Sequence, residues 1–490
     1  MKNKILILFI SLYVMLAEVV NFMSIKHSVA VGISILFLFL IGLVNRYLYI
    51  LIAGFSLIIN TIIIHILIHW GGGNGLFGRF QVAILSPQSE IKEYITNYIT
   101  IMDVIEIIYF IVGLVLLKLF FSLNCKEKYK KYIYGLIIVI SLVFAFLGIF
   151  KKIVPFSYID YYKNANLWKT EMKEREVFIK KHYQNKNTNL IYDKIVVIMG
   201  ESVNKHYLGV YGYKYNTTPF LKSLNPYVFD VIAPTNQTRY SIPIDFSQAR
   251  VEDFGLYKKS ISIVTLFKEY GYKTYWLSNQ FKVGEFDSYI TSMAKEADYS
   301  KIENLQFAIN HSEVKPDEIL LKELNKVYNP KIKQFFVFHL MGSHTSYNKR
   351  YDKNHILFKN PKNLVEEYDN SIFYTDYVLY KILDKFKNQK VLFIYLSDHS
   401  EVVNLKKHGH GFLPPFKDEY EVPLIIYSSI KNDNLMNLKK QNNKKINLEN
   451  FYYIIQNLAL NKDNNISYNK KVMAVTPSNI FDYFKLKFYK

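Results

Sequence analysis

The chain is almost free of cysteine. Cys125 is the one cysteine among 490 residues, so no disulfide bond can form within the chain, and cysteine usage says nothing about its compartment. We also find no internal repeat and no nucleic-acid-binding motif, and we therefore expect neither a repeat architecture nor a nucleic-acid partner. Met1-Lys-Asn-Lys precedes an apolar run without a small-residue cleavage site, so we expect no cleaved signal peptide.

Acidic residues are scarce relative to basic ones. The chain has 61 Lys and Arg against 41 Asp and Glu, which gives a formal net charge of +20. Such an excess favours contact with an anionic surface, and the apolar segments described next favour lipid over nucleic acid. A Lys- and Asn-rich composition bias is the alternative explanation of the charge.

Apolar residues, in contrast, are abundant and concentrated before residue 151. They form five runs, each of about 18 to 24 residues, which is the length of a helix that spans a bilayer. The predicted spans are residues 5–23, 27–44, 47–70, 101–121 and 132–150. We expect a membrane domain over 1–150, an interfacial linker over 151–190 that contains a helix at 167–183, and a catalytic domain over 191–490.

The distribution of basic residues predicts the orientation of these spans. Lys2, Lys4, Arg46 and the lysines at 126, 128, 130 and 131 fall on one side, which we expect to be cytoplasmic. With an odd number of spans, everything after Phe150 then lies outside the cytoplasm. The loop over 71–100 is either a surface segment on the outer leaflet or a plain connector.

From residue 189 onward, short apolar runs alternate with helical patterns. This alternation predicts an α/β domain with a mostly parallel sheet. The predicted strands are 194–199, 273–277, 334–340, 391–396 and 422–428, and the predicted helices are 260–270, 316–327 and 371–387. The Asn- and Lys-rich segment 431–450 is predicted to be a surface loop.

Two of the predicted strands end in residues that bind metals. Ile195-Val-Val-Ile-Met-Gly is followed by Glu201, and Val391-Leu-Phe-Ile-Tyr-Leu-Ser is followed by Asp398 and His399. Ligands bind at the carboxyl ends of parallel strands, so these three side chains are expected to meet. Two carboxylates and an imidazole suit zinc or manganese better than magnesium.

A hydroxyl-rich segment, 234–243, supplies candidate nucleophiles. A hydroxyl that contacts a metal ion has a lowered pKa and can attack phosphorus. From chemistry alone, Thr235, Thr238, Ser241 and also Ser202 qualify. The alternative is that these hydroxyls only make hydrogen bonds within turns.

Three histidines lie in predicted strand-end loops late in the chain. His344 follows the strand at 334–340, and His408 and His410 follow His399 by nine and eleven residues. An imidazole near a phosphate can stabilise developing charge or protonate a leaving oxygen. A single histidine would more often be structural, whereas three in such loops indicate a site.

Together, these stretches resemble the phosphoethanolamine transferases of the alkaline phosphatase (sulfatase-like) superfamily, which include lipid A-modifying and polymyxin-resistance enzymes. The matching features are the five spans and four sequence motifs. The motifs are Gly200-Glu201-Ser202 with Tyr211-Gly-Tyr-Lys-Tyr-Asn-Thr-Thr-Pro219, Thr238-Arg-Tyr-Ser241-Ile-Pro243-Ile-Asp-Phe-Ser247, Met341-Gly-Ser-His344, and Ser397-Asp398-His399-Ser-Glu401.

The resemblance implies a role for each matching residue. Glu201, Asp398 and His399 match zinc ligands, and Thr238 matches a threonine nucleophile that also contacts zinc. His344 matches a histidine near the phosphate, and His408 or His410, with His410 favoured, matches a later one. The implied cofactor is zinc, as one ion with a second left open.

The implied reaction transfers phosphoethanolamine from phosphatidylethanolamine to lipid A, the lipopolysaccharide (LPS) core or another envelope acceptor, through a phospho-threonine. The implied protein is a monomer of the bacterial inner membrane with a periplasmic catalytic domain. Two alternatives remain: a phosphoglycerol transferase of the lipoteichoic-acid-synthase type, and an inactive membrane sensor. A sulfatase nucleophile lies in a C/S-x-P-x-R sequence, and here Asp245 stands where that arginine is required.

The chain departs from the resembled pattern at several positions. Ser400 replaces a glycine, Ile244 replaces a cysteine, and the disulfide bonds usual in these transferases are absent. Each such bond contributes a few kcal/mol, so the catalytic domain must obtain its stability from its core.

Overall fold

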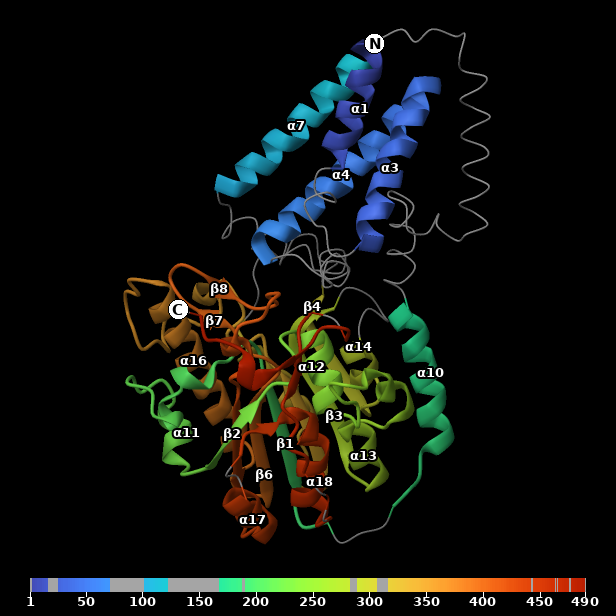
Figure 1. The fold of residues 1–490 in the computed structure, drawn as a ribbon. Helices are drawn as coiled ribbons and strands as arrows, with labels where there is room; N and C mark the ends of the chain where they lie inside the picture. The colour runs from blue at the N-terminus through green and yellow to red at the C-terminus, as the bar shows by residue number, and fades with distance from the viewer. Residues whose placement is uncertain are drawn as a thin grey trace. The chain divides into compact units, whose positions relative to one another are not determined.

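The computed structural model describes most of the domain after residue 190 and four segments before it (Figure 1). The described residues are 2–15, 25–70, 101–121, 167–186, 190–282, 289–305, 316–441, 444–462, 464, 466–475 and 477–489. The chain divides into two compact units, one of Met1–Ser86 and Tyr94–Leu167, the other of Pro87–Glu93 and Trp168–Lys490.

The described part of the first unit consists of helices. They are α1 (Lys2–Val14), α3 (Ile25–Val44), α4 (Arg46–Trp70) and α7 (Ile101–Phe121). These helices overlap four of the five apolar runs, while the run at 132–150 and the loop at 71–100 lie outside the described residues. None of the helices within the described residues is long and apolar enough to cross a membrane.

The second unit is built on an eight-stranded sheet. The strands are β1 (Lys194–Gly200), β2 (Tyr227–Ile232), β3 (Lys273–Lys282), β4 (Tyr299–Leu305), β5 (Gln334–His339), β6 (Val391–Ser397), β9 (Pro423–Ser428) and β10 (Ile446–Asn447). Their order is β10-β2-β9-β6-β1-β5-β3-β4. Only β9 runs antiparallel to its neighbours, β2 and β6, so the prediction of a mostly parallel α/β sheet is confirmed.

Hydrophobic layers cover both faces of the sheet, which is why the central strands read as continuous apolar runs. On β1, Ile195, Val197 and Met199 belong to one core, and Val196 and Ile198 belong to the other. The first core packs beneath α12 (Thr238–Asp245), α13 (Ile263–Glu269) and α18 (Phe451–Leu460). The second packs beneath α15 (Ile319–Val327) and α16 (Leu364–Asp384).

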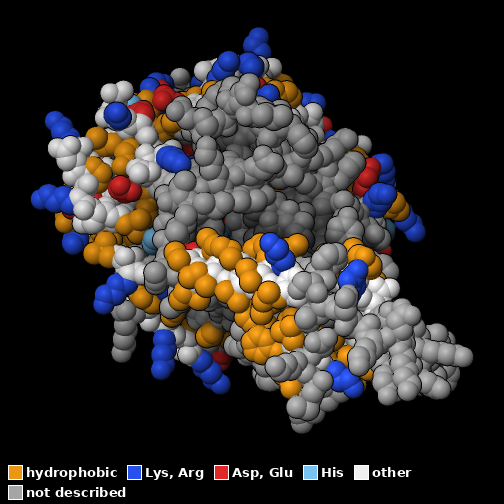
Figure 2. Space-filling view, turned by 90° about the horizontal axis from the view of Figure 1, so that it is seen from above, with side chains coloured by type: hydrophobic (Ala, Val, Ile, Leu, Met, Phe, Trp, Pro, Cys, Tyr) orange, Lys and Arg blue, Asp and Glu red, His pale blue; other side chains and the backbone are white. Residues whose placement is uncertain are grey.

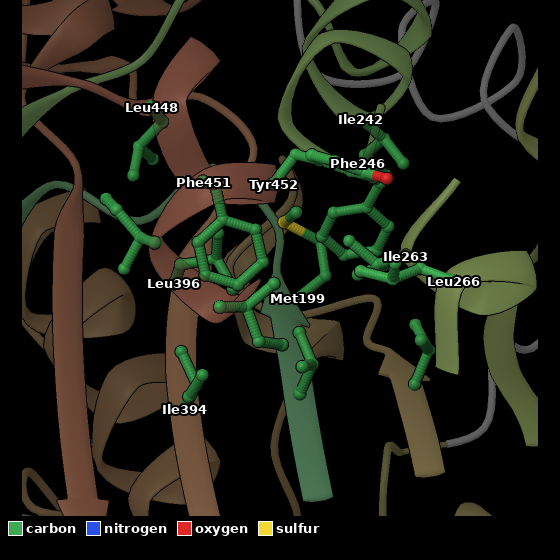
Figure 3. Packing of buried hydrophobic residues seen from close by; sticks show 14 of the residues in the cluster. Met199, Ile242, Phe246, Ile263, Leu266, Ile394, Leu396, Leu448, Phe451 and Tyr452 are labelled. Atoms are coloured by element: carbon green, nitrogen blue, oxygen red, sulfur yellow. The ribbon is translucent and has the colours of Figure 1, made fainter. Parts of the chain in front are cut away.

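The packing of the first core fixes α12 above β1. Figure 3 shows Met199, Phe246 and Phe451 converging from β1, the end of α12 and α18. The ring of Phe246 lies 5.8 Å from that of Phe451 and 5.9 Å from that of Trp276. Because Ile242 and Phe246 are fully buried, the first turn of α12 is held at the end of the sheet.

The register of the strands brings three loops to one edge. Gly200 pairs with Ser397, and Met199 pairs with His339, so the residues after β1, β5 and β6 leave the sheet side by side. Gly342, in the loop after β5, has φ +53°, and a Cβ there would lie 2.8 Å from the nitrogen of Glu201. Glycine is therefore required for the loop to approach Glu201 this closely.

Helix α10 (Leu167–His182) confirms the helix predicted in the linker segment. It packs against the rest of the second unit through Arg175, a fully buried residue. The Arg175 guanidinium donates to a carboxylate oxygen of Glu296 at 2.9 Å and to the carbonyls of Tyr257 and Ser260. Such a buried, fully bonded ion pair fixes α10 to the domain that follows it.

Segment 431–450 is not the loop that its composition predicts. It contains α17 (Asp433–Gln441) and β10, and Leu435 and Leu438 of α17 are buried in the first core. The two leucines, spaced by one helical turn, outweigh the Asn- and Lys-rich surroundings.

Candidate active site and metal centre

Glu201, Asp398 and His399 meet at the carboxyl end of the sheet. Each offers a ligand atom within 4.8 Å of the others, and all three side chains are buried. His399 Nε2 lies 3.2 Å from Glu201 Oε1 and 3.4 Å from Asp398 Oδ2. The three predicted ligands are thus adjacent, on two neighbouring strands.

Thr238 places its hydroxyl among these three residues. As the first residue of α12, it lies over the edge where β1 and β6 end. Its Oγ1 is 3.2 Å from Glu201 Oε2 and 3.1 Å from His399 Nε2. A hydroxyl in this position can share a cation with the carboxylate and the imidazole, and it is also a potential nucleophile.

The orientation of His399 leaves one ring nitrogen available for a metal ion. Its Nδ1 lies 3.0 Å from the carbonyl oxygen of Ser400. A carbonyl only accepts hydrogen bonds, so Nδ1 carries the proton and donates it, and Nε2 points at Glu201 and Thr238. A backbone carbonyl that fixes the ring in this way is the usual second partner of a ligating histidine.

The pKa values of the three residues reflect their burial and their mutual attraction. Burial opposes ionisation of Glu201, but His399 outweighs it and lowers the pKa of Glu201. Burial also disfavours the charged form of His399, yet the charges of Asp398 and Glu201 raise its pKa to about 10. Burial and Glu201 raise the pKa of Asp398 to about 7. The cluster therefore holds a cation favourably, either a proton on His399 or a metal ion.

The donor set fits zinc. Two carboxylates, one imidazole and a hydroxyl oxygen converge on one point, a mixed N and O set with the number of donors that zinc takes. In addition, Asp398 Oδ2 is buried and receives no hydrogen bond within the part of the chain that the structure describes. A bound cation would satisfy this oxygen.

His410 and His344 extend the site, whereas His408 lies further along the hairpin. The His410 ring centre is 3.9 Å from that of His399 and 6.2 Å from that of His344. His408 lies in β8 (His408–Gly409), where its backbone pairs with Val403 of β7. The geometry therefore favours His410 over His408 as the functional histidine.

The other candidate hydroxyls are placed differently. Thr235 Oγ1 donates to the carbonyl of Gln237 at 2.9 Å and lies 3.1 Å from Ser241 Oγ, which fits the alternative reading of hydrogen bonds within a turn. Ser202 Oγ donates to Glu201 Oε1 at 3.0 Å. Of the four hydroxyls, that of Thr238 contacts both Glu201 and His399.

Two residues that the sequence analysis did not single out support the site. Gln280 Nε2 donates to Glu201 Oε2 at 3.1 Å and to the carbonyl of Leu340 at 2.7 Å. Asp317 accepts hydrogen bonds from Asn279 and from the backbone of the loop after β5. Gln280 was missed because β3 continues five residues beyond the predicted strand 273–277.

Fold and site together define an α/β domain with a mostly parallel sheet and, at its carboxyl end, a buried triad that could hold a metal ion. Residues 193–460, more than half of the sequence, match the Sulfatase family, and the chain belongs to that family.

The curated relatives are named as transferases. The chain is 28% identical over 264 residues to phosphoethanolamine transferase EptC of Escherichia coli, and 31% identical over 249 residues to phosphoethanolamine transferase OpgE of the same species. It is 30% identical over 258 residues to phosphoethanolamine transferase EptA of Helicobacter pylori. These alignments cover 48–49% of this chain and 45–47% of the relatives, so the chain matches a little under half of their length.

Solved structures confirm the fold. The zinc complex of the periplasmic domain of Escherichia coli EptC covers 62% of this chain and 96% of its own, with TM-score 0.52 and 22% identity. The integral membrane protein EptA of Neisseria meningitidis covers 93% of this chain and 95% of its own, with TM-score 0.61 and 17% identity. At these identities the likeness establishes the fold alone.

Proposed function

We propose that the chain is a zinc-dependent phosphoethanolamine transferase that acts through a covalent phospho-threonine at Thr238. One observation carries the proposal: the Thr238 hydroxyl lies within 3.2 Å of both a buried carboxylate oxygen and a buried imidazole nitrogen. A nucleophile adjacent to groups that can stabilise its anion is the arrangement that covalent transfer requires.

Glu201, Asp398, His399 and the Thr238 oxygen are the groups that would hold the zinc ion. When bound, it supplies positive charge that lowers the pKa of a hydroxyl and neutralises phosphoryl oxygens. A second ion would have to use the histidines beyond this set, and the proposal does not depend on it.

The protein groups then divide the reaction between them. Thr238 Oγ1 forms a bond to the phosphorus of the donor, and the bond from phosphorus to the glycerol oxygen breaks. Diacylglycerol leaves with the proton that the Thr238 hydroxyl gives up. An acceptor hydroxyl later bonds to the phosphorus, the bond from phosphorus to Thr238 Oγ1 breaks, and the acceptor's proton returns to Thr238. Burial and the neighbouring His399 lower the pKa of His410, so its ring is neutral and keeps one N–H. In this proposal, His410 and His344 each donate an N–H to the phosphoryl oxygens.

The donor in this proposal is phosphatidylethanolamine and the acceptor is lipid A, the LPS core or another envelope glycan. Support comes from the names of the relatives, which include a Kdo(2)-lipid A phosphoethanolamine 7''-transferase of Salmonella typhimurium that is 25% identical over 256 residues. The acceptor hydroxyl must reach Thr238 from the open side of the site.

We place the protein in the bacterial inner membrane as a monomer, with the domain after residue 190 in the periplasm. The five apolar runs and the basic residues that flank them support this placement. Outward-facing apolar side chains of α7, among them Ile107 (58% exposed) and Leu119 (53%), also favour a lipid environment. Confinement of donor and enzyme to one bilayer raises their effective concentration.

The decisive experiment is intact-protein mass spectrometry after incubation with phosphatidylethanolamine and no acceptor. A phosphoethanolamine adduct that maps to Thr238 is the expected result. A glycerophosphate adduct from phosphatidylglycerol would instead support the phosphoglycerol transferase. The absence of any adduct, from a sample shown to contain zinc, would favour an inactive sensor.

A further inference from the structure

Exposed apolar side chains lie on the β7–β8 hairpin and on the segment 483–489, which the reaction does not use. Leu405, at the tip of the hairpin formed by β7 (Val402–Val403) and β8, is 68% exposed. Phe484 and Phe488, near the end of the described chain, are 54% and 45% exposed. Water-exposed apolar side chains of this size that gather in one place usually mark a contact surface.

Aromatic and cationic contacts join the hairpin to the segment 483–489. The Lys407 ammonium lies 5.0 Å from the ring centre of Phe416, whose ring is 5.2 Å from that of Tyr489. The backbone nitrogen of Lys417 donates to the carbonyl of Lys487 at 2.9 Å, and its ammonium lies 5.2 Å from the Phe488 ring. These contacts link the hairpin that carries Leu405 to the segment that carries Phe484 and Phe488, and we call the exposed residues of the two segments the aromatic–lysine patch.

The aromatic–lysine patch is also positively charged. It includes five lysines and two aspartates within the segments 404–407, 417–418 and 482–488; the lysines are Lys406, Lys407, Lys417, Lys485 and Lys487. Both aspartates are engaged by the backbone, since Asp418 accepts from the nitrogen of Tyr489 and Asp482 accepts from that of Phe484. Figure 2 shows apolar side chains with Lys and Arg around them on the left of the view, the side on which Figure 1 places β7, β8 and the C-terminus.

The hairpin connects the aromatic–lysine patch directly to the site. It begins after Glu401 and ends before His410, and the Glu401 Oε2 and His410 Nδ1 atoms lie 3.6 Å apart. Tyr347 donates to the other carboxylate oxygen of Glu401 at 2.6 Å, so the base of the hairpin is fixed while its tip is exposed. A surface that binds the tip of the hairpin is therefore held at a fixed distance from His410.

We propose that the aromatic–lysine patch docks the catalytic domain on an anionic lipid bilayer and holds the active site at the level of the headgroups. Phe and Leu enter the interfacial region while lysines contact anionic headgroups, and this combination of side chains is typical of membrane interfaces. The proposal rests on the proposed function only in that the donor is a membrane lipid. A protein surface as the partner is the competing outcome.

Fluorescence of the full-length chain in nanodiscs tests the docking without any need for activity. Because Cys125 is the only cysteine, a Cys125→Ser background allows one environment-sensitive dye to be attached at Leu405→Cys. The matched control is Ile332→Cys, an exposed apolar position (41%) before β5, at the opposite end of the sheet. The nanodiscs contain phosphatidylcholine alone or with phosphatidylglycerol, and spin-labelled lipids serve as quenchers.

We expect a blue shift and lipid quenching at position 405 that increase with phosphatidylglycerol, and neither effect at position 332. In the Lys485→Gln/Lys487→Gln variant the docking equilibrium should weaken about thirtyfold, since each of the two lysines near an anionic surface contributes roughly 1 kcal/mol. The matched charge control is Lys331→Gln/Lys390→Gln, two exposed lysines at the amino end of strands β5 and β6, which should have no effect.

Two results would overturn the docking proposal. One is a dye at 405 that stays as water-exposed as the dye at 332. The other is a dye at 405 that is shielded from water but not quenched by labelled lipid, which would indicate a protein contact. Docking with no phosphoethanolamine adduct on Thr238 would reject the proposed function and leave the docking intact.

Discussion

The two ends of the central sheet both bury charged side chains, but only one end satisfies them. At the amino end, the Lys194 ammonium donates to the carbonyls of Asn329 and Ile332, and the Gln334 amide binds the backbone of Asn329 and Val327. At the carboxyl end, Glu201 and His399 have hydrogen-bond partners, but Asp398 Oδ2 is buried and receives no hydrogen bond from the described residues.

This difference separates a structural end from a functional end. Backbone carbonyls that bind a buried lysine satisfy its charged group without a ligand. Buried carboxylates that face each other are costly to keep ionised, and they persist where a cation compensates them. The predictions below test this division, and the expected effects decrease from one to the next.

Thr238→Ala should abolish transfer while the fold remains. We expect a loss of about 10³-fold or more in rate, because the covalent intermediate cannot form. The measurement is a transfer assay combined with zinc analysis, and zinc should remain because Glu201, Asp398 and His399 are intact. Thr235→Ala, at a hydroxyl bonded within its own turn, is the matched control; activity retained in Thr238→Ala would rule out this nucleophile.

Removal of the metal should destabilise the carboxyl end. At free zinc 1,000-fold above Kd, binding adds about 4 kcal/mol to the free energy of unfolding, so chelation should lower the Tm of the parent protein.

The pKa of His399 is raised to about 10 in the metal-free protein, so zinc must displace its proton, and zinc affinity should fall as the pH is lowered. Asp398→Ala should make the Tm insensitive to chelation; an unchanged response in this variant would place the metal elsewhere.

Lys194→Ala should have the opposite profile, with lower stability and normal activity per folded molecule. The substitution leaves the carbonyls of Asn329 and Ile332 without their donor. We expect a loss of about 2 kcal/mol, within the range for buried groups left unsatisfied, measured by thermal or denaturant unfolding. The exposed neighbour Lys331→Ala should change stability by less than about 0.5 kcal/mol. A loss of zinc in Lys194→Ala would contradict the assignment of the amino end as purely structural.

The sequence predicted the strands of the sheet centre well, because strands buried on both faces are continuous apolar runs. The predicted strands at 194–199, 334–340 and 391–396 match β1, β5 and β6 to within one residue. The same rule failed at the edge strand β4, which contains Lys301 and Glu303 and has no apolar run. Helix α17 was missed for a different reason, because it lies in an Asn- and Lys-rich segment.

The convergence of Glu201, Asp398 and His399 was predictable for the same reason, since each of them follows a central strand by one or two residues. Contacts that come from β3 and α12 could not be predicted in this way. Gln280 reaches Glu201 only because β3 runs past its predicted end, and the position of Thr238 depends on how α12 packs through Ile242 and Phe246. Local pattern does not encode such packing; for Thr238, the resemblance to known transferases supplied the missing information.

Asp245→Asn should stabilise the protein slightly, in a pH-dependent manner. Asp245 lies at the end of α12, fully buried, and neither carboxyl oxygen has a hydrogen-bond partner within the described residues. Burial, followed by the charges of Asp398 and Glu449, raises its pKa well above the ordinary value. Ionisation is therefore easier in the unfolded chain, and the folded state loses stability as the pH rises above about 4, the pKa of an unfolded aspartate.

The gain in the Asn variant follows from this sign. Asparagine has nearly the same shape and no charge, so the stability difference should be near zero at pH 4 and should grow toward neutral pH, to about 1 kcal/mol or more. Tm measured for both proteins across this pH range tests the prediction. Asn437→Asp, a charge change at an exposed position of α17, is the control, because an aspartate there keeps access to water and a nearly normal pKa. A loss of stability in Asp245→Asn that grows toward neutral pH would mean that the carboxylate is bonded as a charged group, which would make the carboxyl end as fully satisfied at this position as the amino end is at Lys194.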